Sequence, residues 1–331
     1  MTRVGLVGTG FMARTHVERY REMDVTVSAV VAPTGSSSFI KEHDLDAEAY
    51  EDTATFYETA EIDAVDICTP TDTHADLVAA AAERNLDTFV EKPIAPTLSA
   101  AERLRDVVAN TGITCLVGHV LRYFPEYKRA KALAENGGIG SPGVARARRL
   151  APFPTWGSDN WYADRERSGG VFVDLAIHDF DYLRWLWGDV ERVYARTRRN
   201  GPEEHGIATL RFANGAVGYV EASWAQEPAR GALTTDLELA GDDGLIEFST
   251  PDEAPFATYS GDEACVESPV AIDGYRSELE HFLDCVETGS TPAVSVGDAV
   301  DSLRLSLAAK ESAESGRPVT PAEVSVEGVD V

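Results

Sequence analysis

A glycine-rich turn close to the N-terminus constrains the fold more than any other feature. Gly8-Thr9-Gly10-Phe11-Met12-Ala13 follows the short apolar run 4–7 and opens a stretch with helical character. In this G-x-G-x-x-A spacing the first glycine permits a tight turn, the second lets the backbone approach a pyrophosphate, and the alanine keeps helix and strand close. The helix N-terminus then presents free N–H groups to phosphates. The turn predicts dinucleotide binding, with a purely structural glycine turn as the alternative.

Short apolar runs alternate with amphipathic stretches up to about residue 120. Strands are predicted at 4–7, 25–31, 64–68, 88–90 and 115–117, and apolar residues recur at helical spacing in 73–84 and 97–109. Repeated strand–helix units predict a doubly wound parallel sheet with right-handed crossovers, the Rossmann arrangement of an α/β protein. We expect residues 1–120 to form this NAD(P)-binding domain.

The pattern changes over residues 121–331. Helices are predicted at 125–135, 174–187, 275–288 and 297–315, and strands at 144–150, 190–196, 206–212, 216–223, 235–239 and 245–248. Tight turns such as Asn214-Gly215 join consecutive strands, which predicts a large, mostly antiparallel sheet and hence an α+β domain. We expect this second domain to bind the substrate and to mediate oligomerisation.

The end of the second predicted strand bears on the choice of cofactor. NAD-preferring sites usually place Asp or Glu there to bind the ribose hydroxyls, but this chain has Ala32 and Pro33, followed by Thr34 and Ser36. The missing carboxylate and the added hydroxyls are compatible with a 2′-phosphate, although no Arg follows within the segment. We therefore expect NAD(P) as cofactor, with a slight preference for NADP.

Polar groups follow two other predicted parallel strands, at the sheet edge where ligands bind in such folds. Thr69-Pro70 and His74 follow one strand, and Glu91-Lys92-Pro93 follows the next. We assign Thr69, Pro70, His74, Glu91 and Lys92 to the cofactor site. Lys92 has two interpretations: a structural ion pair with Glu91, or a cation at the nicotinamide that stabilises a developing alkoxide.

The segment from Ser168 to Asp181 holds the densest polar pattern of the second half. Asp174 and His178 are four residues apart, so they are predicted to share one face of a single helix. A neutral His there could accept a hydroxyl proton, with the carboxylate tuning its pKa. The alternative, an N-cap Asp and a core His, stays open. The segment has no Cys and no H-x-x-x-H spacing, so no metal is expected.

Composition excludes several classes of protein. The formal net charge is −27, and only 5 of the 29 basic residues are Lys. Such acidity repels nucleic acids and anionic membranes, so neither is an expected partner. Salt near 1 M shortens the Debye length to ~3 Å and would screen this self-repulsion, which favours a halophilic archaeal source over an ordinarily acidic bacterial one. No apolar run is long enough to span a membrane, no leader precedes the first strand, and the four cysteines show no C-x-x-C spacing; these features predict a cytoplasmic protein.

Together the motifs resemble those of the Gfo/Idh/MocA family of NAD(P)-dependent oxidoreductases over nearly the whole chain. The resemblance implies a Rossmann domain followed by an α+β domain with an open sheet, and a homo-oligomer, dimer or tetramer, formed through that sheet. It also implies catalytic roles: His178 takes the hydroxyl proton, Lys92 stabilises the oxygen as hydride leaves, and Asp174 binds the substrate. The departure at Ala32 weakens the case for NAD.

The resemblance further implies a secondary-alcohol substrate, a cyclic polyol such as inositol or an aldose-like sugar. The residues that would line the substrate cleft, besides Lys92, Asp174 and His178, are Arg122, Tyr123, Trp156, Asn160 and Trp161. Polar and aromatic groups suit a polyol, because they offer hydrogen bonds and a flat ring against its C–H face. Two other functions occur in such a family, a non-catalytic NAD(P)-binding regulator and a redox-neutral glycosidase-type enzyme.

Overall fold

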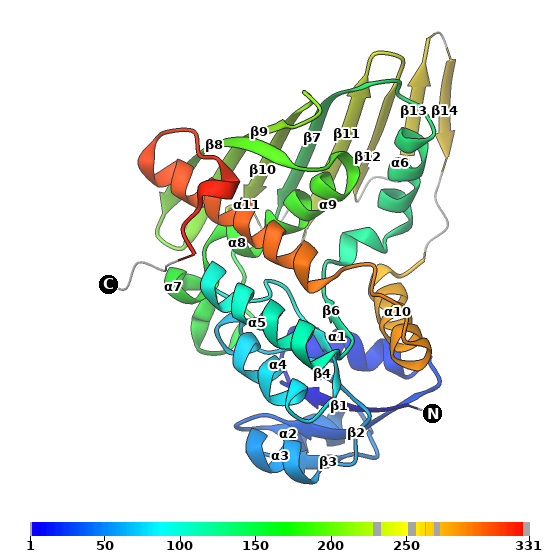
Figure 1. The fold of residues 1–331 in the computed structure, drawn as a ribbon, viewed down its shortest axis with the longest axis vertical. Helices are drawn as coiled ribbons and strands as arrows, with labels where there is room; N and C mark the ends of the chain where they lie inside the picture. The colour runs from blue at the N-terminus through cyan, green and yellow to red at the C-terminus, as the bar shows by residue number, and fades with distance from the viewer. Residues whose placement is uncertain (1, 228–232, 251–255, 262, 268–271, 327–331) are drawn as a thin grey trace.

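The computed structural model describes residues 2–227, 233–250, 256–261, 263–267 and 272–326. It contains a six-stranded sheet in the lower half of Figure 1 and an eight-stranded sheet in the upper half. The predicted combination of a Rossmann sheet with a mostly antiparallel second sheet is confirmed. No helix of the described residues is long and apolar enough to cross a membrane.

All neighbouring strands of the first sheet are parallel, in the order β3-β2-β1-β4-β5-β6. The strands are β1 (Thr2–Val7), β2 (Val25–Val31), β3 (Glu48–Tyr50), β4 (Ala64–Ile67), β5 (Asp87–Val90) and β6 (Cys115–Val117). The helices between them are α1 (Phe11–Tyr20), α2 (Ser36–Glu42), α3 (Thr53–Thr59), α4 (His74–Ala82) and α5 (Leu98–Thr111). The central strands are apolar and buried, as parallel strands covered on both faces must be.

The end of the chain returns to the first sheet. Helices α10 (Gly274–Thr288) and α11 (Val296–Ser315) supply Leu279, Phe282 and Val300 to the core that surrounds that sheet. The ring of Phe282 meets that of Phe89 in β5 edge-on, with centroids 5.8 Å apart. Part of the core of the first sheet therefore comes from the C-terminal helices.

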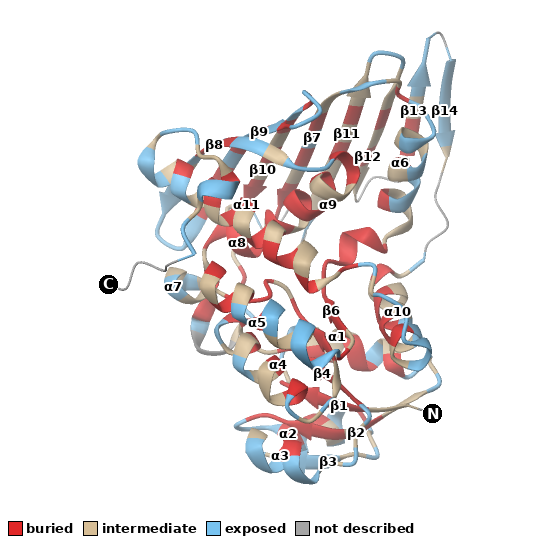
Figure 2. Ribbon diagram, viewed as in Figure 1, coloured by how far each residue is buried: buried red, intermediate tan, exposed pale blue. Residues whose placement is uncertain are grey.

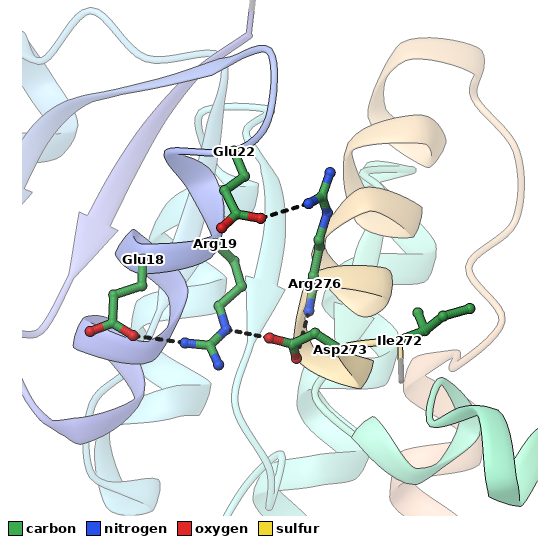
Figure 3. A pocket seen from close by; sticks show the side chains of 6 residues that line it. All are labelled: Glu18, Arg19, Glu22, Ile272, Asp273 and Arg276. Atoms are coloured by element: carbon green, nitrogen blue, oxygen red, sulfur yellow. Dashed lines mark hydrogen bonds and ion pairs between the residues drawn. The ribbon is translucent and has the colours of Figure 1, made fainter. Parts of the chain in front are cut away.

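Charged pairs hold α10 against α1 at the surface. Arg19 Nε lies 2.9 Å from an Asp273 oxygen, and Arg276 Nη1 lies 2.6 Å from Glu22 Oε2 (Figure 3). With Glu18 and Ile272 these side chains line a surface pocket. Since these ion pairs use the charged groups that line the pocket, the pocket is part of the contact between the two helices.

The second sheet has the order β14-β13-β12-β11-β7-β10-β9-β8, and only the β7–β10 pair among its described neighbours is parallel. Its strands are β7 (Pro142–Leu150), β8 (Val190–Asn200), β9 (Glu203–Phe212), β10 (Val217–Ser223), β11 (Thr234–Gly241), β12 (Leu245–Thr250), β13 (Phe256–Ser260) and β14 (Glu263–Glu267). Helices α6 (Pro125–Glu135), α8 (Val171–Asp174), α9 (Ile177–Trp187) and α11 lie over one face (Figure 1).

The opposite face of this sheet is open. Exposed and buried residues alternate strictly along β9 (Figure 2). Many of the exposed positions are charged: Arg148 on β7 pairs with Glu221 and Asp236 at 3.2 Å, beside scattered apolar groups such as Ile207. Charge pairs across neighbouring strands therefore let much of this face meet water.

The predicted helix 174–187 is wrong at its start. The chain forms the short helix α8, bends at Leu175 and Ala176, and begins α9 at Ile177. In one continuous helix the carbonyl oxygen of Asp174 would accept the N–H of His178. Here Lys92 Nζ donates to that oxygen at 2.8 Å. Lys92, which is far away in sequence, thus donates to the oxygen that would accept the next hydrogen bond of a continuous helix.

Candidate active site

The glycine turn has the geometry that a dinucleotide requires. Gly8 has φ +105°, and a Cβ atom there would lie 2.5 Å from the carbonyl oxygen of Cys68, so only glycine fits. Gly10 precedes α1 and has open space where its Cβ would point. No described side chain caps α1, which leaves its first N–H groups for a phosphate. The residues present therefore fit a pyrophosphate.

The ribose end of the predicted cofactor site is only partly as expected. Ala32 is buried and Thr34 is exposed. Gly35 adopts φ +87° and turns the chain into α2. The hydroxyl of Ser36 donates to the carbonyl oxygen of Tyr50 at 2.8 Å, so its proton is already used within the fold. Thr34 is the more accessible of the two predicted hydroxyls.

Lys92 and Asp174 meet where the two sheets face each other. Lys92 follows β5, and its Nζ lies 3.0 Å from Asp174 Oδ1 as well as bonding the Asp174 carbonyl oxygen. The side chains are 16% and 10% exposed, respectively. The partner of Lys92 is therefore Asp174 and not Glu91, whose carboxylate instead accepts the Lys92 backbone N–H at 3.2 Å. A small polar ligand can reach this partly open pair.

His178 lies in the first turn of α9 and is half-buried. Burial, and next the nearby charge of Lys92, hold its pKa well below the usual value for histidine. A buried imidazole of this kind is neutral near pH 7 and can accept a proton. Its Nδ1 atom has no hydrogen-bond partner among the described residues. Because the helix is broken, Asp174 lies at the end of α8 and His178 lies near the start of α9, so they do not share the face of one helix.

The Thr69-Pro70 segment is fixed by a buried histidine. His74 opens α4, and its ring lies between the carbonyl oxygens of Thr69, 2.9 Å from Nε2, and Pro93, 2.8 Å from Nδ1. Burial lowers the pKa of this ring. His74 thus ties the loop after β4 to the loop that carries Lys92. The structure gives its ring backbone partners on both sides, and gives Thr69 and Pro70 a defined place at the sheet edge.

Arg122 and Tyr123, two of the expected substrate residues, are each 4% exposed. The Arg122 guanidinium donates two hydrogen bonds to Asp181, at 2.8 and 2.7 Å, and a third to the carbonyl oxygen of Ala293 at 2.9 Å. Its donors are therefore engaged inside the protein. The structure does not bring Arg122 together with the Lys92–Asp174 pair as a free ligand-binding group.

The other expected substrate residues lie on one connection after β7. Trp156 is 55% exposed, and its ring centroid lies 5.6 Å from that of Phe11, which is equally exposed. Asn160 is exposed with φ +52°, and Trp161 is buried and stacked on Tyr162 at 4.1 Å. The connection therefore reaches the glycine turn. It places Trp156 beside the cofactor site.

An ion pair adds a second bridge at the same place. Arg167 in α7 (Arg165–Ser168) lies 2.9 Å from an Asp72 oxygen in the loop after β4. Arg167 and Asp72 are far apart in the sequence, so no local pattern predicts their contact. Together with the Phe11–Trp156 contact, it joins the second sheet's connections to the edge of the first sheet.

A buried polar network behind Glu91 was not predicted. His16 Nδ1 lies 2.8 Å from Asp66 Oδ2 and 3.3 Å from Cys68 Sγ, while His16 Nε2 lies 3.4 Å from Glu91 Oε1. His16, Asp66 and Cys68 are the one group in the described ranges whose ligand atoms could hold a metal ion, all within 4.8 Å of one another. Their mutual hydrogen bonds account for the cluster. No sequence spacing signals it, because His16 lies in α1, far in sequence from Asp66 in β4 and from Cys68 directly after that strand.

Comparison with known proteins gives the same picture. Residues 2–119 match the family described as "Oxidoreductase family, NAD-binding Rossmann fold", and residues 127–247 match "GFO/IDH/MocA C-terminal domain". The chain is 30% identical to a myo-inositol 2-dehydrogenase of Thermotoga maritima, over 97% of this chain and 99% of that protein. It is 31% identical to a D-xylose 1-dehydrogenase (NADP(+)) of Haloferax volcanii, over 78% of this chain and 80% of the relative.

A solved structure extends the similarity to three dimensions. The crystal structure of a probable dehydrogenase from Thermotoga maritima superposes with a TM-score of 0.84 at 28% identity, covering 98% of this chain and 100% of the other. Sequence and structure therefore agree from one end of the fold to the other. This chain belongs to the GFO/IDH/MocA family of NAD-binding oxidoreductases.

Proposed function

We propose that this protein oxidises a secondary hydroxyl of a cyclic polyol or sugar, with NAD(P) as hydride acceptor. The main observation behind the proposal is the ion pair between Lys92 and Asp174, 3.0 Å apart. It lies at the same sheet edge as the glycine turn that fits a dinucleotide. The neutral His178 supplies the base that the reaction needs. Two relatives that match over most of the chain are named as a myo-inositol dehydrogenase and a D-xylose dehydrogenase.

Lys92, His178 and Asp174 then have distinct roles in the reaction. The nicotinamide, when bound, supplies the hydride acceptor. Lys92 binds the substrate oxygen and stabilises the negative charge that develops on it as the proton leaves, before the C–H bond breaks and the oxygen becomes a carbonyl. His178 accepts the hydroxyl proton. Asp174 holds Lys92 in place and accepts a hydrogen bond from a neighbouring substrate hydroxyl.

A panel of inositols, other polyols and aldoses, assayed with NAD and NADP at high KCl, tests the proposal. We expect absorbance of the reduced nicotinamide to rise with at least one of them. Tight cofactor binding without turnover across the panel would point to the regulator. Release of free sugar from a glycoside without net reduced cofactor would point to the redox-neutral reaction.

We further propose that NADP is slightly preferred. The support is the absence of an acidic residue directly after β2 and the exposed hydroxyl of Thr34. A carboxylate at that position would repel a 2′-phosphate. The preference is measured as kcat/KM with each cofactor, and a higher value with NAD would contradict it.

The organisation of the molecule is also part of the proposal. We assign cofactor binding to residues 1–120, and substrate binding and assembly to residues 121–331. The support for a homo-oligomer, a dimer or tetramer, is the open face of the second sheet, where Tyr194, Ile207 and Val217 are exposed between charged side chains. Sedimentation velocity of the intact protein measures the subunit number, and a monomer at micromolar concentration would contradict this assignment.

We propose finally that the protein works in the cytoplasm of a halophilic organism. The support is a net charge of −27 with few lysines, and four cysteines that form no disulfide. High salt would screen the repulsion among the carboxylates. The melting temperature should therefore rise between about 0.1 and 3 M KCl, a range over which the Debye length shortens roughly fivefold. A melting temperature that falls with salt would contradict the halophilic origin.

A further inference from the structure

His119 is a buried histidine close to the candidate catalytic residues that has no assigned role so far. It follows β6, at the same carboxyl edge of the first sheet as Lys92, and precedes the short helix η2 (Val120–Arg122). Only 1% of the residue is exposed, and neither ring nitrogen has a hydrogen-bond partner within the described ranges. A buried polar group without a partner destabilises the folded protein. Such a residue calls for an explanation.

His119 faces the helix that carries His178. Its Nδ1 lies 4.0 Å from Asp181 Oδ2. Asp181 follows His178 by three residues in α9, and residues three apart are neighbours on a helix surface. His178 Nδ1 is itself buried and unpartnered in the part of the chain that the structure describes. His119 is also one of the charged groups that act on His178, so the two histidines lie near each other, and both present buried nitrogens that no described residue satisfies.

The surrounding charges distinguish the two rings. The charged groups that act on one or both of them are Lys92, Arg122, Arg149, Asp181 and Asp298. Burial lowers the pKa of both histidines, and that of His178 falls further, because the charged groups that act on it are all cationic. His119 has the Asp181 carboxylate beside it, and His119 and Arg122 outweigh burial to keep the pKa of that carboxyl low. A proton is thus better accommodated on His119 than on His178.

We propose that His119 is a positioning residue that accepts the proton of His178 across one bridging water, a step that rests on the proposed dehydrogenase function. A water between the two rings would satisfy buried nitrogens on both. The substrate O–H bond breaks and its proton binds His178 Nε2. The N–H bond at His178 Nδ1 then breaks, and that proton passes through the water to a ring nitrogen of His119. His178 becomes neutral again, and the positive charge on His119 faces Asp181. After product release the proton returns through the same water to His178 and leaves from Nε2 to bulk water, so the next turnover starts with both rings neutral.

The variant His119→Gln tests this role, because an amide can hold a water but cannot carry a proton. We expect kcat for alcohol oxidation to fall roughly tenfold at low buffer concentration, less than the ~100-fold or more that loss of the base itself would cause. KM for the substrate should stay unchanged. Raising the concentration of imidazole buffer should restore kcat, because free base can reach His178 through the cleft after product release.

The matched control is His281→Gln on α10, a half-buried histidine that accepts the Ala293 N–H and touches neither Lys92 nor His178 in the described contacts. Its kcat should equal that of the unmodified protein at every buffer concentration. Unchanged kcat in His119→Gln, or a loss that imidazole does not relieve, would overturn the relay and leave His119 a packing residue.

A crystal structure of the unmodified protein gives an independent test that does not depend on the variant folding. We expect an ordered water within hydrogen-bond distance of His178 Nδ1 and a His119 nitrogen. A well-ordered structure without that water overturns the proposal. If the protein turns over no polyol or sugar, the proposed function fails, and the water is still present or absent in the crystal.

Discussion

Replacing Lys92 by Met separates the structural and chemical contributions of the Lys92–Asp174 pair. The substitution keeps the length of the side chain but leaves the Asp174 carboxylate, in a residue 7% exposed, without its cation. Breaking a buried pair costs about 3–5 kcal/mol. Because the two side chains remain 16% and 10% exposed, water compensates in part, and we expect about 2–3 kcal/mol. That is a fall in melting temperature of roughly 4–10 °C.

Catalysis should suffer independently of stability. Without the Lys92 ammonium, the developing alkoxide loses its charged partner, and kcat should fall by at least ~100-fold. The double variant Lys92→Met/Asp174→Asn removes the unpaired charge, so it should recover stability but no activity. Lys310→Met in α11 is the control and should change neither quantity.

Melting curves and initial rates on the four proteins decide the reasoning. Near-normal turnover of Lys92→Met would refute the role of Lys92 in the reaction. Equal destabilisation of the single and double variants would refute the cost assigned to an unpaired Asp174.

Other predictions follow from the same site. His178→Ala should lower kcat by at least ~100-fold while cofactor affinity, measured by nicotinamide fluorescence, stays the same; a small effect on kcat would remove His178 as the base. The lowered pKa of His178 means that the base is neutral above the usual histidine pKa, so kcat/KM for oxidation should be flat at neutral pH and fall only as pH drops below about 6.5; an acid limb above that value would contradict the burial argument. Trp156→Ala removes the ring that contacts Phe11, and the dissociation constant for the dinucleotide should rise about 2- to 12-fold, the equivalent of ~0.5–1.5 kcal/mol; unchanged binding would mean that the contact forms without consequence for the cofactor.

Helices and strands whose bounds follow from a regular local spacing of apolar residues could be predicted closely. The helix Pro125–Glu135 has a proline in its first turn and ends before the pair Gly137-Gly138, and its predicted bounds match the structure. Strand β3 was not predicted, because Glu48–Tyr50 is short and largely exposed at the sheet edge, without an apolar run. β14 (Glu263–Glu267) is likewise almost wholly exposed and shows no alternation.

Site features that depend on distant partners could not be predicted in the same way. The four-residue spacing of Asp174 and His178 suggested one helix, but the helix is broken at Leu175 and Ala176, where Lys92 donates to the Asp174 carbonyl oxygen. Arg122 looked like a substrate ligand from its place in the motif order, but Asp181 occupies its guanidinium. Residue spacing predicts contacts within one helix or strand. It cannot predict which side chain from a distant segment will bond to a residue of that element.

Because the C-terminal helices pack against the first sheet, the core around that sheet is completed only late in translation. Leu279 and Phe282 belong to the core around that sheet, yet they are translated only after every strand of the second sheet. At about 5–20 residues per second, the first sheet waits on the ribosome for roughly ten seconds or more with that part of its surface uncovered. During this interval the nascent chain exposes an apolar patch that a chaperone could bind. Premature termination before α10 would leave that patch permanently exposed, so a truncated product should aggregate even though its strands of the first sheet are all present.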